Sequence, residues 1–417
     1  MEDTIKSVVD RDLCHGCGTC VSSCPLEIIE MTRDERRGIY VPQLDPALCN
    51  NCGVCLKVCP GHSVDFDQLN MYLFSQKPAD NLLGFYTKCY SGYSADEDLR
   101  YGGASGGIVT TLLVAALEEG LIDGALVSRM SELNPLEPAP FIARTRDEII
   151  SAARSKYCPV PANIALGEIL NADGKYAVVG LPCHIHGIRK FEQINKKLAD
   201  RIVLHIGIFC GYTYSFLATD YLLLRNGIDR QDVRAINYRG EGWPGMATIR
   251  LHSGRDVSIP YFETFNTVKL AFCPWRCFLC CDGSAELADI SCGDAWLPEF
   301  AGDSAGTSVI VSRTAQGEDI LQKFAEKGYI EIRDISPGLV LTSQPGFFFK
   351  KAHIRLFSWL TRARGKEVPE YKTELGKMNV GRFFHALLQA IGPLLASRRY
   401  LWRFIPALNW INRCDST

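Results

Sequence analysis

The sequence CHGCGTCVSSCP at residues 14–25 returns as CNNCGVCLKVCP at residues 49–60, and this duplication decides the fold of the amino-terminal part. In each copy the four cysteines are separated by two, two and three residues, and a proline follows the last one. The repeat has a period of 35 residues, counted from Cys14 to Cys49. Between the copies, residues 27–31 and 38–42 favour two short strands around a charged turn.

This spacing is typical of bacterial ferredoxins, in which the fourth cysteine of each run binds the other cluster. Three thiolates at two-residue spacing wrap one cubane from a tight loop, which Gly16, Gly18 and Gly53 keep narrow. The exchange assigns Cys14, Cys17, Cys20 and Cys59 to one [4Fe–4S] cluster and Cys24, Cys49, Cys52 and Cys55 to the other. Zinc also accepts four thiolates, but zinc ribbons lack the third closely spaced cysteine and the trailing proline. We therefore predict a two-cluster ferredoxin-like domain at residues 1–76.

The composition indicates a packed metalloprotein of the cytoplasm. Of the 417 residues 47% are hydrophobic and 22% charged, which excludes disorder as the main state. Lys and Arg number 45 against 47 for Asp and Glu, so no nucleic-acid partner is expected. No apolar run reaches the length of a transmembrane helix, and residues 1–10 lack the apolar core of a signal peptide. The 18 cysteines of an unexported chain then point to metal rather than disulfides.

Beyond a linker-like stretch at residues 77–95, apolar strand-like runs alternate with helical stretches to about residue 335. Residues 108–119 predict a helix, and residues 126–127, 176–179 and 202–209 predict buried strands. Residues 249–259 predict an antiparallel hairpin instead. The pattern favours a mixed α/β (α+β) core domain at residues 90–335, followed by a carboxy-terminal extension at residues 336–417.

A glycine-rich turn precedes the predicted helix at residue 108. Such a turn lets main-chain N–H groups and the positive helix end face an anionic group, and Ser105 is expected to cap the helix. The candidate binding residues are Gly102, Gly103, Ser105, Gly106 and Gly107. The turn matches neither the dinucleotide fingerprint nor the P-loop, and an ordinary turn is the alternative interpretation.

Further cysteines follow strand-like runs, where α/β folds place functional loops. Cys183 and Cys210 each end an apolar run, and Cys277 and Cys280 form a Cys-x-x-Cys pair. From the residues alone this group is compatible with a redox dithiol, a disulfide, a metal site or plain buried thiols.

Together these motifs resemble the family of β subunits of coenzyme F420-reducing hydrogenase, fused to an amino-terminal two-cluster ferredoxin. The resemblance extends from residue 1 to about residue 317 and includes GGASGG at residues 102–107, GLPC at 180–183 and FCG at 209–211. It implies an FAD-binding domain with a third [4Fe–4S] cluster, whose matching ligand positions are Cys183, Cys210, Cys277 and Cys280. This chain departs from the family pattern at Leu181 and His184, and it carries Cys273, Cys281 and Cys292 in addition. Those three cysteines are either buried thiols or an alternative ligand set.

The resemblance also suggests which residues surround a flavin. Lys156 would meet the pyrophosphate or stabilise charge on the reduced ring, and His184 with His186 would relay protons. Gly293, Asp294 and Arg313 are the further binding candidates. Ordinary structural roles are the alternative for every one of these residues.

The implied function is a flavin and iron–sulfur oxidoreductase that moves electrons between F420, or a similar hydride carrier, and ferredoxin-type clusters. One alternative is an electron-transfer subunit that passes electrons to ferredoxin or to redox-partner subunits of a larger complex. Another is a ferredoxin-fed reductase of a pigment-like or other small molecule. The chemistry of the cofactors is compatible with all three.

The carboxy-terminal residues 378–413 have a character of their own. From Lys377 to Arg413 there are six Lys or Arg and no acid. An apolar helical stripe is formed by Phe383, Leu387, Ile391, Leu394 and Leu395. Basic charge with Phe384, Trp402, Phe404 and Trp410 favours docking on an anionic membrane surface or on a partner, so a peripheral membrane location is expected. A helix packed back on the domain is the alternative.

Overall fold

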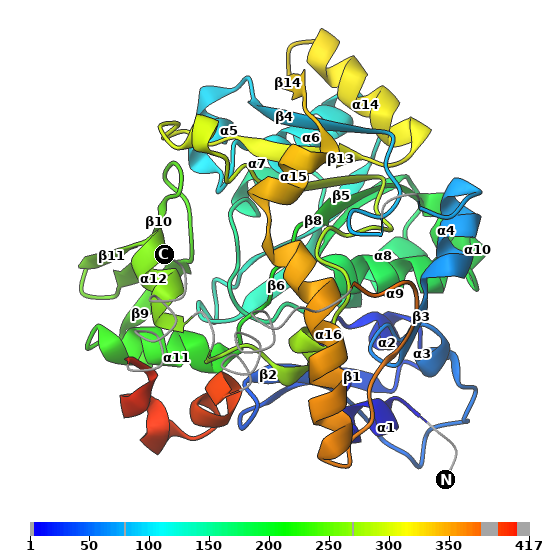
Figure 1. The fold of residues 1–417 in the computed structure, drawn as a ribbon, viewed down its shortest axis with the longest axis vertical. Helices are drawn as coiled ribbons and strands as arrows, with labels where there is room; N and C mark the ends of the chain where they lie inside the picture. The colour runs from blue at the N-terminus through cyan, green and yellow to red at the C-terminus, as the bar shows by residue number, and fades with distance from the viewer. Residues whose placement is uncertain (1–3, 79–80, 269–270, 377–390, 407–417) are drawn as a thin grey trace.

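The computed structural model describes residues 4–78, 81–268, 271–376 and 391–406, and Figure 1 shows a small module of the first residues below a larger α/β domain. An eight-stranded mixed sheet forms the centre of the larger domain. Its order is β14 (Ile330–Asp334), β4 (Lys88–Ser94), β13 (Ser308–Ser312), β12 (Ile290–Asp294), β8 (Ile202–Ile208), β7 (Tyr176–Gly180), β5 (Gly124–Met130) and β6 (Pro138–Ala143). The predicted strands at residues 126–127, 176–179 and 202–209 are confirmed within β5, β7 and β8.

Strand direction gathers several loops at one edge of this sheet. β5, β7, β8 and β12 are parallel to one another. β4 has the same direction, because it is antiparallel to β13, which is itself antiparallel to β12. The carboxyl ends of five strands therefore meet at one edge, which is where open α/β sheets hold their functional loops.

Apolar side chains alternate between the two faces of the central strands. Ala177 of β7 packs into one core cluster with Leu112 and Phe324, whereas Val178 packs into another with Ile188 and Leu198. Because helices cover both faces of the sheet, these strands have apolar residues at successive positions instead of alternating apolar and polar ones. The surrounding helices are α5 (Glu97–Gly102), α6 (Ile108–Glu118), α7 (Arg146–Ser151), η1 (Ala162–Ala165), α8 (Leu166–Asn171), α9 (Pro182–Glu192), α10 (Lys196–Arg201), η3 (Pro298–Phe300) and α14 (Ala315–Glu326). α11 (Phe216–Arg225) packs in a different cluster, with Val233, Ile236 and Ile249.

The helix expected at residue 108 is confirmed as α6, but its expected cap is wrong. The N-cap residue is Gly107, whose φ of +72° is left-handed, and no side chain caps the helix. The hydroxyl of Ser105 donates instead to the carbonyl oxygen of Thr307 at 3.2 Å. Glycine is favoured at such a position because a Cβ is strained there.

The amino-terminal module consists of α1 (Ile5–Asp10), α2 (Thr19–Ser22), β1 (Ile29–Asp34), β2 (Ile39–Leu44), α3 (Val54–Lys57), β3 (Ser63–Asp65) and α4 (Phe66–Phe74). The two predicted strands between the cysteine runs are confirmed, since β1 and β2 pair antiparallel from Ile29 opposite Leu44. A ferredoxin-type domain therefore precedes the α/β domain.

A second small sheet lies beside the main one in the order β11 (Asp256–Pro260), β10 (Met246–Leu251) and β9 (Val233–Asn237), preceded by η2 (Arg230–Asp232). The hairpin predicted at residues 249–259 is confirmed as β10 and β11, with Ile249 opposite Val257. Two short helices follow, α12 (Tyr261–Val268) and α13 (Trp275–Phe278).

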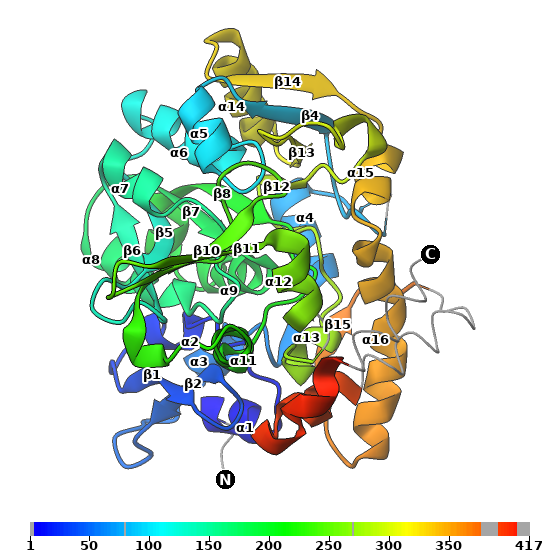
Figure 2. The same cartoon turned by 90° about the vertical axis from the view of Figure 1, so that its left-hand side faces the viewer.

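The carboxy-terminal extension joins the two modules. It contains α15 (Pro337–Ser343), the long α16 (Gly346–Ala363), β15 (Glu370–Lys372) and η4 (Arg399–Phe404). β15 pairs parallel with β3 of the amino-terminal module, with Tyr371 opposite Val64. Figures 1 and 2 both show α16 running along the molecule from below α15 to the level of that module.

The expected docking surface at residues 378–413 is only partly within the described residues. Phe383, Phe384, Leu387 and Trp410 lie outside them. Ile391 and Leu394 are exposed, as the prediction requires. Trp402, however, is 5% exposed and its indole N–H donates to the Ala396 carbonyl oxygen at 2.9 Å. For Trp402 the docking prediction is wrong, because the ring packs edge-on against Tyr221 and Phe272 of the domain core.

Within the described ranges, no helix has both the length and the apolar character needed to cross a membrane.

Candidate functional site

Two cavities in the amino-terminal module are lined by the cysteines of the repeat. One contains Cys14, Cys17, Cys20 and Cys59, and the other Cys24, Cys49, Cys52 and Cys55. The turn glycines Gly16 and Gly53 have φ of +72° and +71°, a region that favours glycine. Main-chain N–H groups point at the sulfurs, and that of Gly16 lies 3.3 Å from Cys14 Sγ. Each cavity thus combines four thiols with N–H donors, the environment that thiolate-bound clusters use.

The cysteines of the first cavity are less exposed than those of the second. Burial raises the pKa of the Cys14 thiol to about 12, with smaller contributions from Cys59 and Cys17. Cys52 of the second cavity is exposed. In the described residues no three His, Cys, Asp or Glu side chains converge tightly enough for a single metal ion. Thiolates of a cubane cluster each bind a different iron atom and need no such convergence.

A third group of cysteines gathers at the carboxyl edge of the main sheet. Cys183 is the second residue of α9, shortly after β7, and Cys210 follows β8. Cys277 lies in α13 and Cys280 follows that helix. Burial raises the pKa of Cys183 well above its usual value, and Cys17, Cys210, Cys280 and Cys277 add to the shift. The same cause raises the pKa of Cys210 to about 12, against an opposing effect of Lys350. The four cysteines therefore lie close enough to act on one another electrostatically.

The third group lies against the first cavity of the amino-terminal module. Cys17, which lines that cavity, is among the residues whose charge acts on Cys183. The N–H of Asn163 donates to the Cys17 carbonyl oxygen at 2.9 Å, and its side-chain amide donates to Thr19 Oγ1 at 2.8 Å. The same amide also donates to the carbonyl oxygen of His184 at 3.0 Å. Buried hydrogen bonds thus hold the two cysteine groups together.

The glycine-rich turn lies beside two other loops at the same sheet edge. Arg154 Nε donates to the Gly102 carbonyl oxygen at 3.0 Å. A Cβ on Gly106 would come within 3.0 Å of the Gly306 carbonyl oxygen, whereas a Cβ on Gly102 would meet nothing. A Cβ on Gly103 would lie 3.1 Å from the Leu99 carbonyl oxygen. The turn is therefore packed on one side and open on the other.

Lys156 does not face open space. Its ammonium donates to the carbonyl oxygens of Ala152, Ala153 and Arg154, so it caps the end of α7. Burial lowers its pKa to about 7. Lys156 lies at a helix end, as the structural alternative expects, and its role at a flavin stays a prediction.

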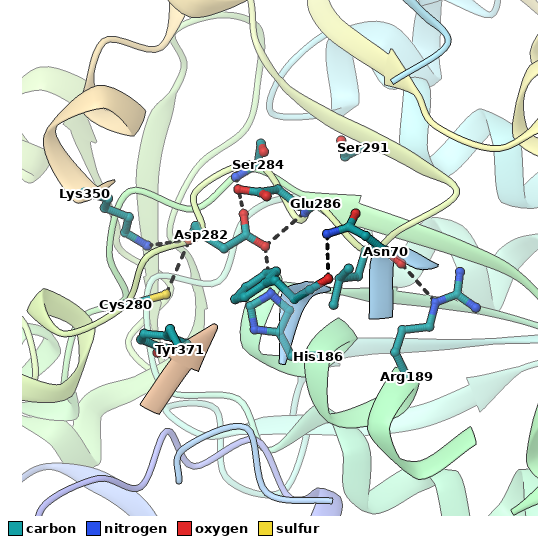
Figure 3. Close-up of polar contacts among 12 residues, drawn as sticks. Asn70, His186, Arg189, Cys280, Asp282, Ser284, Glu286, Ser291, Lys350 and Tyr371 are labelled. Carbon is teal, nitrogen blue, oxygen red and sulfur yellow. Dashed lines mark hydrogen bonds and ion pairs between the residues drawn. The ribbon is translucent and has the colours of Figure 1, made fainter. Parts of the chain in front are cut away.

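His184 and His186 are both bonded to protein groups. The N–H of Leu181 donates to His184 Nδ1 at 3.2 Å, so Nε2 carries the proton and donates to the Val160 carbonyl oxygen at 3.0 Å. Burial lowers the pKa of His184 to about 4, which keeps the ring neutral. His186 Nε2 lies 2.7 Å from the carboxylate of Asp282, as Figure 3 shows. Both rings hold structure in place, and a proton relay through them has no support in these contacts.

Arg313 is fully buried and bonds only to protein groups. Its guanidinium donates to the carbonyl oxygens of Leu83, Phe85 and Ser284 and to the hydroxyl of Ser291. It braces the loop before β4 against the core, and the expected contact with an anionic cofactor tail is not supported.

Asp294 at the end of β12 is held by residues that lie outside the predicted site. Arg239 forms a two-point ion pair with its carboxylate at 2.6 and 3.0 Å, and the indole N–H of Trp243 donates to it at 3.0 Å. Trp243 and Trp296 are in contact, with ring centroids 4.5 Å apart. Gly293 fits closely against Phe209, since a Cβ there would overlap that ring. The glycine-rich run RGEGWPG at residues 239–245 is the sequence feature that could have indicated a functional loop here.

Models of known families match most of the chain. The 4Fe-4S dicluster domain matches residues 13–62. The "Coenzyme F420 hydrogenase/dehydrogenase, beta subunit" models match residues 89–166 with the N-terminal part and residues 173–338 with the C-terminal part. Residues beyond 338 are outside these models.

Individual relatives agree with these matches. The coenzyme F420 hydrogenase subunit beta of Methanothermobacter thermautotrophicus is 32% identical over 272 residues, which are 62% of this chain and 90% of that protein. One subunit of the F420H2 dehydrogenase of Methanosarcina mazei is 24% identical, covering 82% of this chain and 91% of that one. The coenzyme F420-dependent sulfite reductase of Methanocaldococcus jannaschii is 28% identical, but only 49% of it is covered.

A solved structure has the same fold. A chain of the F420-reducing [NiFe] hydrogenase complex from Methanosarcina barkeri matches with a TM-score of 0.53 and 25% identity, covering 69% of this chain and 97% of that one. Together with the clustered cysteines and the mixed sheet, these matches show that the chain belongs to the family of coenzyme F420 hydrogenase/dehydrogenase β subunits, as an iron–sulfur protein with a 4Fe–4S dicluster domain at its amino terminus.

Proposed function

We propose that this chain is an FAD-dependent iron–sulfur oxidoreductase subunit that exchanges electrons between coenzyme F420, or a similar hydride carrier, and its [4Fe–4S] clusters. The observation that carries the proposal is that Asn163 bonds to the carbonyl oxygens of both Cys17 and His184, which holds the sheet-edge cysteines against the first amino-terminal cavity. Electrons would enter or leave the chain at the other end of this series of clusters, near the exposed Cys52 of the second cavity. Relatives that are named for F420 support the choice of carrier.

A third [4Fe–4S] cluster would be held by Cys183, Cys210, Cys277 and Cys280. The donor set fits, because the four thiols gather at one edge of the sheet and Cys210, Cys280 and Cys277 all act electrostatically on Cys183. Cys183 also lies in the first turn of α9, whose N-terminal N–H groups favour a thiolate. The cluster would carry one electron at a time between the flavin and the amino-terminal clusters.

FAD would bind at the glycine turn, where the start of α6 offers N–H groups that no side chain caps. Gly106 and Gly107, with φ of +69° and +72°, let the main chain approach an anionic group closely. When bound, a flavin accepts two electrons as a hydride and releases them singly. Arg239 and Trp243 fix the position of the Asp294 carboxylate at this edge.

A second candidate is an electron-transfer subunit within a larger complex that turns over no small molecule itself. Leu26 and Leu48 are 43% and 60% exposed in the module that holds the second cavity, and Leu26 lines that cavity together with Cys52. An apolar rim around an exposed redox centre suits contact with a redox-partner subunit. Relatives named as hydrogenase or dehydrogenase subunits favour such a partner.

The test is anaerobic purification followed by iron and flavin analysis and by anaerobic mixing with oxidised F420 and a low-potential donor. We expect one FAD, about twelve iron atoms per chain from three four-iron clusters, and bleaching of the F420 absorbance. Bleaching that requires FAD supports the enzyme. Flavin and clusters that are reduced by dithionite while F420 stays oxidised would favour the electron-transfer subunit.

A further inference from the structure

Lys350 is a buried cation supplied by the carboxy-terminal extension. It lies on α16, outside the residues that the family models match, and its exposed fraction is 4%. Its ammonium donates to the Asp282 carbonyl oxygen at 3.1 Å and lies 5.5 Å from the centroid of the Tyr212 ring. Figure 3 shows the side chain pointing toward the loop that holds Cys280 and Asp282.

No carboxylate among the described residues neutralises this ammonium. The carboxylate of Asp282 is already used by His186 at 2.7 Å and by the N–H groups of Ser284 and Glu286. The next residue, Lys351, has an ordinary counter-ion, because its ammonium lies 2.5 Å from Glu286. A buried ammonium without a paired negative charge is unfavourable, so the compensating charge has to come from elsewhere.

Cys280 is a neighbour of Lys350, because its thiol donates at 3.4 Å to the same Asp282 carbonyl oxygen that accepts from the ammonium. Cys280, Cys210 and Cys277 are also the cysteines that favour the charged form of Lys350. All three belong to the group proposed above as ligands of the third cluster. A [4Fe–4S] cluster with four thiolates carries net negative charge, and reduction adds one more unit. A fixed positive charge nearby therefore stabilises the reduced cluster more than the oxidised one.

The position of Lys350 is fixed by the packing of α16 on α13, which carries Cys277. Phe357 of α16 stacks on Phe278 with ring centroids 4.6 Å apart and an angle of 15°. The Trp275 indole N–H donates to Thr361 Oγ1 at 2.8 Å. These contacts hold the cation at a constant place relative to the cysteines of α13.

We propose that Lys350 is the counter-charge of the third cluster and raises its reduction potential, so that the carboxy-terminal extension tunes this electron carrier. Lys350 acts as a positioning residue and not as a ligand. The proposal rests on the third cluster of the proposed function.

The test compares Lys350→Met with Lys350→Arg and with Arg355→Met in the full chain. Arg355 is an exposed cation on the same helix, so its removal causes the same loss of charge where solvent screens it. Potentials are measured by anaerobic redox titration followed by electron paramagnetic resonance, with iron content as a second readout. We expect a more negative potential for one cluster in Lys350→Met, a potential near that of the wild type in Lys350→Arg, and no shift in Arg355→Met.

Every outcome of this experiment either supports or overturns the counter-charge role of Lys350. Loss of four irons in Lys350→Met, with retention in Lys350→Arg, would also support a counter-charge role. Equal potentials in Lys350→Met and Arg355→Met, or cluster loss in both Lys350 variants, would overturn it. Wild-type protein with about eight irons, from two clusters of four, would overturn the third cluster itself, which separates failure of the proposed function from failure of the counter-charge.

Discussion

The guanidinium of Arg276 donates a hydrogen bond of 2.9 Å to the carbonyl oxygen of Leu13, across 263 residues of sequence. Arg276 belongs to α13, beside Cys277, and Leu13 precedes the first cysteine of the repeat. The same group donates to the Gly61 carbonyl oxygen at 3.1 Å and to the Tyr371 hydroxyl at 2.8 Å. One buried side chain therefore connects the α/β domain, the amino-terminal module and the carboxy-terminal extension.

Arg276→Met should weaken the contact between the α/β domain, the amino-terminal module and the carboxy-terminal extension. It leaves the buried carbonyl oxygens of Leu13 and Gly61 without donors, which should lower the free energy of unfolding by on the order of 3 kcal/mol. Thermal unfolding under anaerobic conditions measures the loss, and Arg355→Met is the surface control. Stability equal to that of the control would show that the guanidinium contributes little to the joint.

Cys277→Ser should remove the third cluster alone. Iron content is expected to fall from about twelve to about eight atoms per chain, since one four-iron cluster is lost. Cys292→Ala is the matched control, because burial alone raises the pKa of that thiol to about 12 and no other cysteine acts on it. Cys273→Ser distinguishes the ligand sets, since Cys277 and Cys210 are near Cys273. Iron loss in Cys273→Ser with retention in Cys277→Ser would replace the proposed ligand.

Gly106→Ala should weaken flavin retention. The added Cβ meets the Gly306 carbonyl oxygen at 3.0 Å in a left-handed conformation, with φ of +69°, so the turn must shift. Gly102→Ala is the control, because a Cβ there meets nothing within 4 Å. FAD content after gel filtration is the measurement. Equal retention in the two variants would place the cofactor away from this turn.

Trp402→Ala should destabilise the protein by about 3–5 kcal/mol, the usual cost of truncating a large buried ring. Tyr400→Ala is the control, because Tyr400 is 65% exposed two residues away. Chemical denaturation followed by circular dichroism compares the two variants. A loss below about 1 kcal/mol in Trp402→Ala would show that the tail is dispensable for the fold.

Local chemistry explains why much of the fold could be predicted from the sequence. The strands around residues 33–37 and the hairpin at residues 249–259 depend on alternation and turn residues within a few positions of one another. The interleaved cysteine spacing likewise predicts two groups of thiols, and the structure lines two cavities with those groups. The family resemblance rests on short motifs and is confirmed by the family models.

Contacts between distant segments decided the rest. Whether Lys156 reaches a ligand or caps a helix end depends on packing that no spacing encodes. The buried position of Arg313 depends on two distant loops and on strand β12. The basic tail predicts a docking segment, but the Trp402 ring packs against Tyr221 and Phe272 in the core. By itself the sequence determined which residues can bind iron, because ligand identity and spacing are local. Only the tertiary structure decided that Cys17 lies beside Cys183 and that Lys350 faces Cys280, because both relationships require the chain to close over long stretches of sequence.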